Sequence, residues 1–162
     1  MAVLCKLGHC KIGLLSGRFS PQVSEARIEG FVKTLAKYGI PVDDRFIADI
    51  EPALEDGEEI MTRMLREVDR PTAFFCTNDT IAAGAMKAVT RAGLRVPEDI
   101  AIVGFDDSYI SRVVEPELTT VRIDAAKMGC LAMQTLFDLI AGMPVEKAHI
   151  QIPTELIVRG TA

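Results

Sequence analysis

Short apolar runs alternate along this chain with longer segments whose apolar positions recur at helical spacing. Four apolar runs predict strands, at residues 11–17, 43–50, 71–77 and 100–107. The three segments between them predict helices, at residues 20–40, 54–68 and 80–93. Because strands and helices of this length alternate, the chain is predicted to form parallel βαβ units. The near-continuous apolar character of the strands indicates an α/β fold whose sheet is covered on both faces, a doubly wound arrangement.

The ends of the predicted helices are marked by particular residues. Gly39 and Gly93 each follow the last turn of a helical pattern, where a left-handed residue commonly ends a helix. Asp79 or Thr80 is a suitable N-cap for the helix at residues 80–93. The apolar side of the second helix is expected to extend to Val68.

The alternation of strands and helices changes after Asp107. The remaining segments predict a long connection at residues 108–121, a strand at 118–123, a strongly apolar helix at 124–142, and one or two closing strands within 148–160. A chain of 162 residues is most simply a single domain.

Composition and charge exclude several classes of protein. Apolar residues make up 49% of the chain and charged residues 25%, which is ordinary for a soluble globular protein. The net charge of −5 is not the basic footprint of a nucleic-acid-binding surface. No apolar run is long enough to span a bilayer. The N-terminal apolar stretch contains Lys6, His9 and Lys11 and is not typical of a signal peptide, so we expect a cytoplasmic protein.

The four cysteines do not suggest a disulfide framework or a metal centre. They form no CxxC pair, and the chain has enough apolar residues to build a core without disulfides, so we expect reduced thiols. Cys5, His9 and Cys10 are the nearest approach to a metal cluster. No second ligand group with zinc-like spacing follows them, and we expect no metal and no cofactor.

Polar residues follow three of the four predicted strands. Because the carboxyl ends of parallel strands meet at one edge of a sheet, where ligands bind, these residues should gather along one rim. They are Ser16, Arg18, Ser20, Asn78, Asp79, Asp106 and Asp107. Arg27 follows on the first helix, whose N-terminal turns point at the same rim.

Each rim residue has a structural interpretation as well as a binding one. Asp107 is more typical of a turn, and an isolated arginine such as Arg27 is usually solvated. For Asn78 and Asp106 the residues alone leave both interpretations open. Amide, carboxylate and guanidinium groups around a cleft suit a neutral polyol or a small heterocycle.

Nothing in the sequence favours catalysis. There is no phosphate-binding GxxxxGK[ST] or GxGxxG motif and no G-x-S-x-G elbow. His9 and His149 are predicted to lie away from the rim. The adjacent Asp106 and Asp107 could form part of a metal-assisted phosphoryl-transfer site, but no nearby lysine or histidine completes one. We therefore expect a protein that is not an enzyme, with no catalytic residues.

Five short stretches stand in a specific order along nearly the whole chain. They are LGHCKIGLLSG, SEARIEGFVKTLAKYGI, FFCTNDTIAAGAMKAVTRAGLRVPEDIAIVGFDD, PELTTVRIDAAKMG and ELIVRGT. In this order and spacing they resemble the C-terminal part of the lactose/galactose repressor family of bacterial transcription regulators. The third stretch is the most specific.

The resemblance implies a periplasmic-binding-protein-like fold, in which an effector lies in a cleft between two α/β lobes. In that family the arginine of Arg-x-x-Gly, the asparagine of Asn-Asp and the first aspartate after Val-Gly-Phe/Tyr contact the effector. The matching positions here are Arg27, Asn78 and Asp106. The resemblance thus implies that Asn78 faces the ligand, while Asp79 and Thr80 start the helix.

The chain also departs from the family pattern. The family's helix-turn-helix, its hinge and most of its first lobe are missing. The chain, residues 1–162, is therefore expected to be a single effector-domain fragment. Residues 11–107 should form the core lobe, and residues 120–141 the segment that normally crosses to the first lobe. Residues 149–159 should form the closing strands. Pro52 stands where many relatives have an aromatic residue, and Ile123 where some have a glutamine.

The resemblance implies an effector-sensing and dimerisation part of a repressor, which binds a small polar metabolite such as a sugar. We expect a homo-oligomer, no contact with a membrane, and DNA contact only through a helix-turn-helix domain outside this chain. Two alternatives are a stand-alone sugar-binding protein of the same fold and a pure oligomerisation module with a vestigial cleft. Two segments should expose apolar residues for assembly: Tyr109, Ile110, Val113, Val114 and Leu118 in the connection, and Ala126, Met128, Leu131, Met133, Leu136, Phe137 and Ile140 in the late helix.

Overall fold

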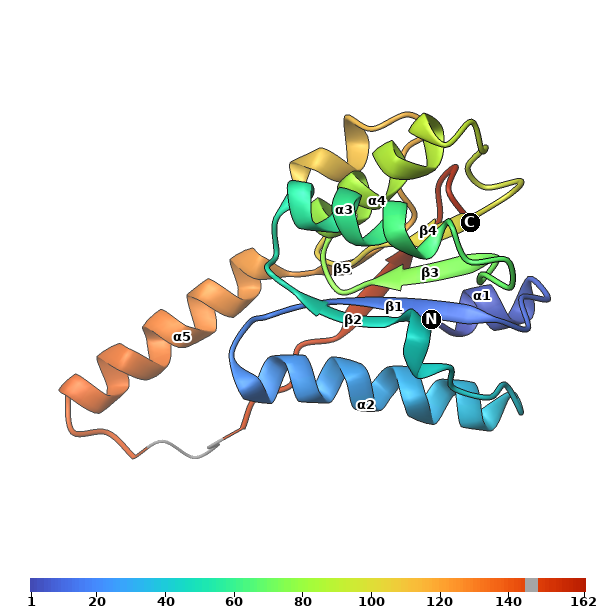
Figure 1. Cartoon of the computed structure of the whole chain (residues 1–162). Coiled ribbons are helices and arrows are strands. Elements are labelled where there is room, and N and C mark those ends of the chain that lie inside the picture. Colours follow the sequence, from blue (N-terminus) through green and yellow to red (C-terminus); the bar gives the residue numbers. More distant parts are fainter. Residues whose placement is uncertain (145–148) are drawn as a thin grey trace.

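A parallel four-stranded sheet forms the centre of the computed structural model, which describes residues 1–144 and 149–162 (Figure 1). The strands are β1 (Ile12–Gly17), β2 (Ile47–Ile50), β3 (Ala73–Cys76) and β4 (Ala101–Val103). They lie in the order β2-β1-β3-β4, and every neighbouring pair is parallel. This confirms the parallel sheet that the four apolar runs predict.

Helices cover both faces of the sheet, as the apolar strands predict. In Figure 1, α3 and α4 lie on one face and α2 lies on the other, and α1 contributes Leu4 to the apolar cluster on the α2 side. Their bounds are α1 (Ala2–Lys6), α2 (Pro21–Lys37), α3 (Leu54–Met64) and α4 (Asp79–Arg91). Short 3-10 turns, η1 (Asp44–Phe46) and η2 (Tyr109–Arg112), precede β2 and follow β4. The short α1 was not predicted, and it adds Leu4 to the core below the sheet.

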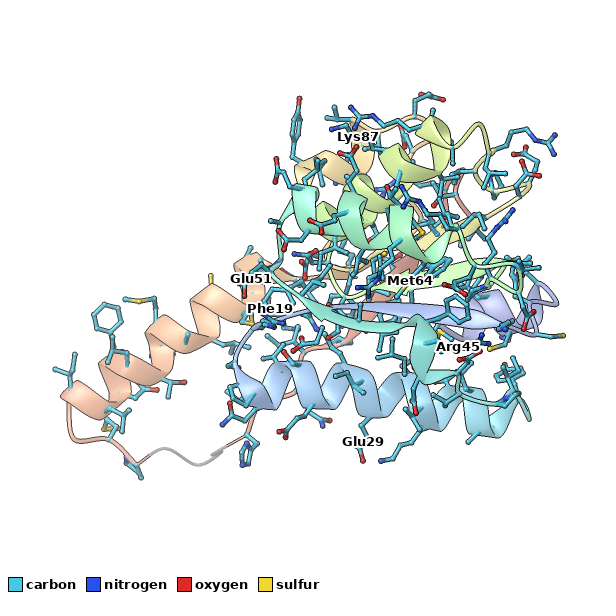
Figure 2. All side chains as sticks on the ribbon, in the orientation of Figure 1. Phe19, Glu29, Arg45, Glu51, Met64 and Lys87 are labelled. Carbon is cyan, nitrogen blue, oxygen red and sulfur yellow. The ribbon has the colours of Figure 1, made fainter. Side chains whose placement is uncertain are left out.

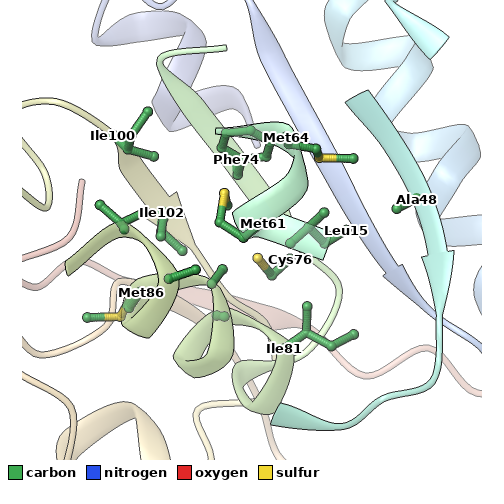
Figure 3. Close-up of a cluster of buried hydrophobic side chains, with 14 of the residues drawn as sticks. Leu15, Ala48, Met61, Met64, Phe74, Cys76, Ile81, Met86, Ile100 and Ile102 are labelled. Atoms are coloured by element: carbon green, nitrogen blue, oxygen red, sulfur yellow. The ribbon is translucent and has the colours of Figure 1, made fainter. Parts of the chain in front are cut away.

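Two apolar clusters fill the spaces between the sheet and its helices. The larger cluster joins Met61 and Met64 of α3 and Met86 of α4 to Leu15 and Phe74 of the sheet (Figure 3). The smaller cluster packs Phe31 and Leu35 of α2 against the other face. Together they fix the sheet and leave its carboxyl edge as the place where polar residues emerge.

The last part of the chain contains one strand pair and a projecting helix. β5 (Thr120–Ile123) pairs antiparallel with β6 (Thr154–Ile157), so the described part of the expected closing region holds one strand, and Ala148 lies outside the described residues. His149, which was placed in a late strand, lies in irregular structure. Helix α5 (Ala125–Ile140) projects from the lobe and buries none of its residues (Figure 1). None of the described helices is long and apolar enough to cross a membrane.

Two expectations about exposure were wrong. Val68 is fully exposed, because α3 ends at Met64 and the chain then leaves the helical face. Leu118 is fully buried in the larger cluster, so the connection after β4 exposes less apolar surface than predicted. Tyr109 and Val113 of this connection are exposed, as expected.

Helices α3 and α4 approach each other closely because glycines stand at their contact. A Cβ atom at Gly84 would overlap the backbone carbonyl of Leu54, and one at Gly57 would lie 2.5 Å from the backbone oxygen of Ile81. Both obstructions are backbone atoms, which cannot rotate away as a side chain does. The spacing of the two helices therefore depends on the absence of side chains at these positions.

The substitution Gly84→Ala is expected to lower the free energy of unfolding by about 1–3 kcal/mol or more, because the added methyl group forces the helices apart. The matched control is Gly30→Ala in the exposed part of α2, where a Cβ meets no atom within 4 Å. This control should raise stability by roughly 0.5–1 kcal/mol, the ordinary gain from replacing glycine inside a helix. Urea denaturation of both variants measures the difference. Equal effects of the two substitutions would contradict the close-contact interpretation.

Candidate functional site

The carboxyl ends of β1, β3 and β4 bring the predicted site residues together. Arg27 reaches this edge from α2, and its Nη1 donates a hydrogen bond to the backbone carbonyl of Thr77, which follows β3. Its Nη2 lies 3.7 Å from Oδ1 of Asp106, which follows β4. Arg27, Asp106 and the Thr77–Asn78 segment thus form one polar group at the edge of the sheet.

Two aromatic rings hold the guanidinium of Arg27. Its central carbon lies 4.3 Å from the ring centroid of Phe105 and 5.0 Å from that of Phe19. Such cation–π contacts orient the charge and reduce its freedom. Figure 2 shows Phe19 and Glu51 at the same end of the sheet. The sequence reasoning did not single out either phenylalanine, although both follow strand ends directly, in the stretches SGRFS and GFDD.

Asp106 carries a charge that the site does not neutralise fully. Burial raises the pKa of its carboxyl group to about 6, the Arg27 guanidinium opposes this shift, and the Asp79 carboxylate adds to it. Its backbone has a φ of 111°, uncommon for a residue with a side chain, and its N–H donates to the carbonyl of Val121 at 2.8 Å. The carboxylate is thus held in an unusual conformation beside a single cation.

Asn78 has a structural role that was assigned to its neighbours. Its Oδ1 accepts a hydrogen bond from the backbone N–H of Ile81 at 2.8 Å, so Asn78, and not Asp79 or Thr80, is the N-cap of α4. The cap uses the side-chain oxygen and leaves the two amide N–H donors outside it. Its position next to Thr77 keeps it at the polar edge, and it is 7% exposed.

Asp79 is a buried connector and not a cap. Its carboxylate accepts hydrogen bonds from the backbone N–H of Ser108, at 2.7 Å, and from Oγ1 of Thr120. Burial raises the pKa of Asp79, and these hydrogen bonds oppose the rise. A Cβ atom at Gly104 would overlap this carboxylate, so the glycine of the GFDD stretch makes room for it.

Asp107 was interpreted as a turn residue, and this was incomplete. Its φ of 51° does place it in a turn, but its side chain is 2% exposed and forms ion pairs with Arg112, Arg122 and Arg159. Burial alone would raise the pKa of Asp107, but hydrogen bonds from Arg159 and Arg122 outweigh it and hold the pKa well below its usual range. Sequence reasoning missed this role because the three arginines lie 5, 15 and 52 residues away.

Three other rim residues do not join the polar group. Ser16 is fully buried in β1. Arg18 pairs at 3.2 Å with Asp49 of the neighbouring edge strand β2 and at 3.3 Å with Glu51, which follows that strand. Ser20 precedes α2 and makes no side-chain cap. The predicted rim therefore divides into a site around Arg27 and residues that serve the fold.

A hollow of about 540 Å³ extends from Asp106 and Asp107 along β5 and β6. Ile123 and the start of α5 line it, together with Arg122 and Glu155, which form an ion pair at 3.3 Å. The Ile123 position, where some relatives carry glutamine, thus presents an apolar group close to the polar edge.

These features define an α/β lobe with a group of polar side chains at the carboxyl edge of a parallel sheet, the edge at which open α/β sheets commonly bind ligands. The whole chain, residues 1–162, matches the periplasmic binding protein-like domain family, and the chain belongs to that family. The curated relatives that it matches include repressors, and the solved structures that it matches include regulators of the LacI family, with the match on their effector domain.

Three similar proteins illustrate the sequence identity and the structural similarity that the chain shares with its relatives. The HTH-type transcriptional repressor PurR of Mannheimia succiniciproducens is 38% identical over 152 residues, which cover 94% of this chain and 46% of the relative. A regulatory protein of the LacI family from Chloroflexus aggregans superposes with a TM-score of 0.92 at 30% identity, over 99% of this chain and 58% of that one. The cellobiose complex of the transcriptional regulator CelR gives a TM-score of 0.93 at 27% identity, over 99% and 49%. The chain spans about half the length of its curated relatives.

The raised pKa of Asp106 predicts a pH dependence of stability. Because the folded chain holds this proton more tightly than the unfolded chain, the free energy of unfolding should fall as the pH rises from about 4 through about 6. Asp106→Asn removes the titrating carboxyl group and, with it, the cost of its buried charge at neutral pH. The substitution should therefore raise the free energy of unfolding of the chain at neutral pH by on the order of 1 kcal/mol, after allowance for solvent screening. Urea denaturation at both ends of this pH range measures the change.

The control for this experiment is Asp44→Asn in the exposed turn η1, which makes the same change of side chain outside the polar site. If the Asp106→Asn variant lost stability with rising pH as steeply as the parent does, the strained position of the Asp106 charge would be refuted.

Proposed function

We propose that this chain is the effector-sensing part of a bacterial transcriptional regulator and binds a small polar metabolite through Arg27, Asn78 and Asp106. The observation that carries the proposal is the separation of 3.7 Å between Arg27 Nη2 and Asp106 Oδ1. This is too long for a hydrogen bond, so both charged groups keep hydrogen-bonding capacity for a ligand. The amide donors of Asn78 stand beside them. A ligand with hydroxyl or amide groups would supply hydrogen-bond partners to these groups.

A sugar is the effector class that we propose first. A carboxylate acceptor and a guanidinium donor at this distance suit the paired hydroxyls of a polyol, and the rings of Phe19 and Phe105 provide apolar surface next to them. The structural likeness to a regulator in complex with cellobiose supports this choice. A small heterocycle with amide edges is the second candidate, because the same groups can bind ring heteroatoms.

We propose binding without catalysis and a place in the cytoplasm, where a repressor meets its DNA. The charged groups that shift the pKa of Asp106 are Arg27 and Asp79, and each also has a structural partner, which is the Thr77 carbonyl for Arg27 and the Ser108 N–H and Thr120 hydroxyl for Asp79. Operator contact would belong to a separate helix-turn-helix part of the regulator. A stand-alone sugar-binding protein would share the site, whereas an assembly module would have no ligand.

The binding prediction is tested by calorimetry on the longest natural polypeptide that contains this chain, with cellobiose, D-galactose, adenine and cytidine as the panel. Arg27→Ala and Asp106→Ala should each weaken binding of the panel compound that the parent binds by about 1–3 kcal/mol, because each leaves a polar group unmatched. Asn78→Asp keeps the capping oxygen but removes the amide donors, so it should weaken binding with little loss of stability.

Arg18→Ala is the matched control for this series, because Arg18 lies at the same edge but is paired with Asp49 and Glu51. Its affinity should equal that of the parent. Unchanged affinity in both the Arg27→Ala and the Asp106→Ala proteins would rule out the site, and the absence of binding by any panel compound would favour the assembly module.

We also propose that the chain forms a homo-oligomer through α5. The helix exposes large apolar side chains along its length, and a surface this apolar rarely faces only water. They are Met128, Met133, Leu136, Phe137, Leu139 and Ile140. A second copy of the chain, with helices exchanged or packed side by side, offers a matching surface.

Light scattering at micromolar concentration should give a mass above the 17.7 kDa of one chain. The double substitution Leu136→Ser and Phe137→Ser should restore the monomer, since it removes two exposed apolar side chains without touching the core. Val68→Ser, at a fully exposed position away from α5, should leave the mass unchanged. A monodisperse parent chain at the monomer mass would disprove this assembly.

A further inference from the structure

Two consecutive residues with side chains have positive φ angles at the end of β4. The values are 111° for Asp106 and 51° for Asp107. Such conformations are strained for residues other than glycine, and they persist where the surrounding structure fixes them. The contacts that fix this turn therefore also set the direction of the Asp106 carboxylate.

Asp107 is fixed by arginines from three separate parts of the chain. Its Oδ1 accepts from Nη2 of Arg159 at 2.5 Å, and its Oδ2 accepts from Nε of Arg122 at 2.7 Å. Arg112 adds a longer contact of 3.3 Å and is 58% exposed, whereas the Arg159 side chain is 11% exposed. Of the three contacts, the one with Arg159 is the shortest and the best shielded from water.

Arg159 is itself held rigidly. Its Nη1 donates to the carbonyl of Leu118 at 2.8 Å, and its Nε lies 3.4 Å from Glu117. Two residues later, Oγ1 of the fully buried Thr161 donates to the carbonyl of Ile102 in β4 at 2.6 Å. The end of the chain is thus bonded to the strand that leads into the Asp106–Asp107 turn, and Arg159 is a fixed support for that turn.

We propose that Asp107 and Arg159 form a positioning pair, which holds the Asp106 carboxylate toward Arg27 and thereby sets the affinity of the site for its effector. Neither residue of the pair needs to touch the effector. This inference rests on the proposed function of Asp106 as a ligand-binding group. The backbone bond from Asp106 to Val121 fixes the start of the turn, and the pair fixes its end.

A purely structural ion pair would also stabilise the chain, so stability alone does not test the proposal. The substitution Arg159→Met removes the buried partner of Asp107 and keeps much of the side-chain length. Arg112→Met removes an exposed partner of the same carboxylate and serves as the matched control. Asp107→Asn is a second test variant, which retains the volume of the side chain and tolerates a positive φ.

The first measurement is an NMR titration of the Asp106 carboxyl group in the ligand-free chain. The parent should titrate near pH 6, which reflects its burial beside Asp79 and Arg27. In Arg159→Met and in Asp107→Asn the carboxyl group should turn toward water, and its pKa should fall by about one unit or more toward the ordinary value near 4. Arg112→Met should titrate like the parent. A titration unchanged in both test variants, with lowered stability alone, would overturn the positioning role.

The second measurement is calorimetry on the longest natural polypeptide that contains this chain, with cellobiose, D-galactose, adenine and cytidine. For the panel compound that the parent binds, affinity should fall about tenfold or more in Arg159→Met and stay within about twofold in Arg112→Met. Arg159→Lys keeps the charge but not the forked geometry, and should recover part of the loss. Equal affinities of the Arg159→Met and Arg112→Met proteins would refute the pair. Failure of the parent to bind any panel compound would refute the proposed function instead, and the ligand-free titration decides the positioning pair in either case.

Discussion

The polar site depends on one constraint, which is that four parallel strands end at the same edge of the sheet. Hydrogen bonding between parallel strands fixes their direction, so the residues after β1, β3 and β4 emerge close together although they are far apart in sequence. Arg27 reaches this edge because α2 starts beside it. The apolar clusters above and below the sheet stabilise this arrangement. Gly57, which faces the backbone of Ile81, and Gly84, which faces the backbone of Leu54, let α3 and α4 approach closely as they cover it.

Two adjacent carboxylates at this edge have opposite environments. Asp107 is surrounded by arginines, which hold its pKa well below the usual range, and its charge is fully matched. Asp106 has one cation at 3.7 Å, and burial raises its pKa to about 6. A matched buried charge adds rigidity, whereas an incompletely matched one reduces stability and can gain from a ligand. The two neighbours thus divide structural support and proposed recognition between them.

The sequence predicts the parallel sheet, its helices and the edge where polar residues meet, because these follow from the spacing of apolar residues. It also predicts that Arg27 and Asp106 lie together. It assigned the N-cap of α4 to Asp79 or Thr80, which was wrong, since asparagine is an equally suitable cap and Asn78 takes that position. Tertiary contacts determine which residue is the cap, because the Asp79 carboxylate accepts hydrogen bonds from the Ser108 N–H and from the Thr120 hydroxyl on β5.

Long-range ion pairs were likewise beyond local reasoning. From the sequence alone Asp107 is typical of a turn residue. Its buried ion pair with Arg159 forms only in the folded chain, where the closing segment lies beside the turn. Thr161, which joins that segment to β4, has no sequence signal of its own.

Helix α5 shows the difference between local and tertiary determinants most clearly. Asp124 caps it by accepting from the backbone N–H of Lys127 at 2.8 Å, and most of its residues favour helix, so its local signals suffice to define its bounds. Its apolar side chains gain little from the lobe, since none of them is buried and only Leu131 is half-buried. In water, an isolated helix of this length is only marginally stable. Packing of its apolar residues against another surface, as in the proposed homo-oligomer, would supply the free energy that the lobe does not. Strand β5 directly precedes α5 in the chain, and its Val121 and Arg122 bond to Asp106 and Asp107, so the proposed assembly surface and the polar site share one strand.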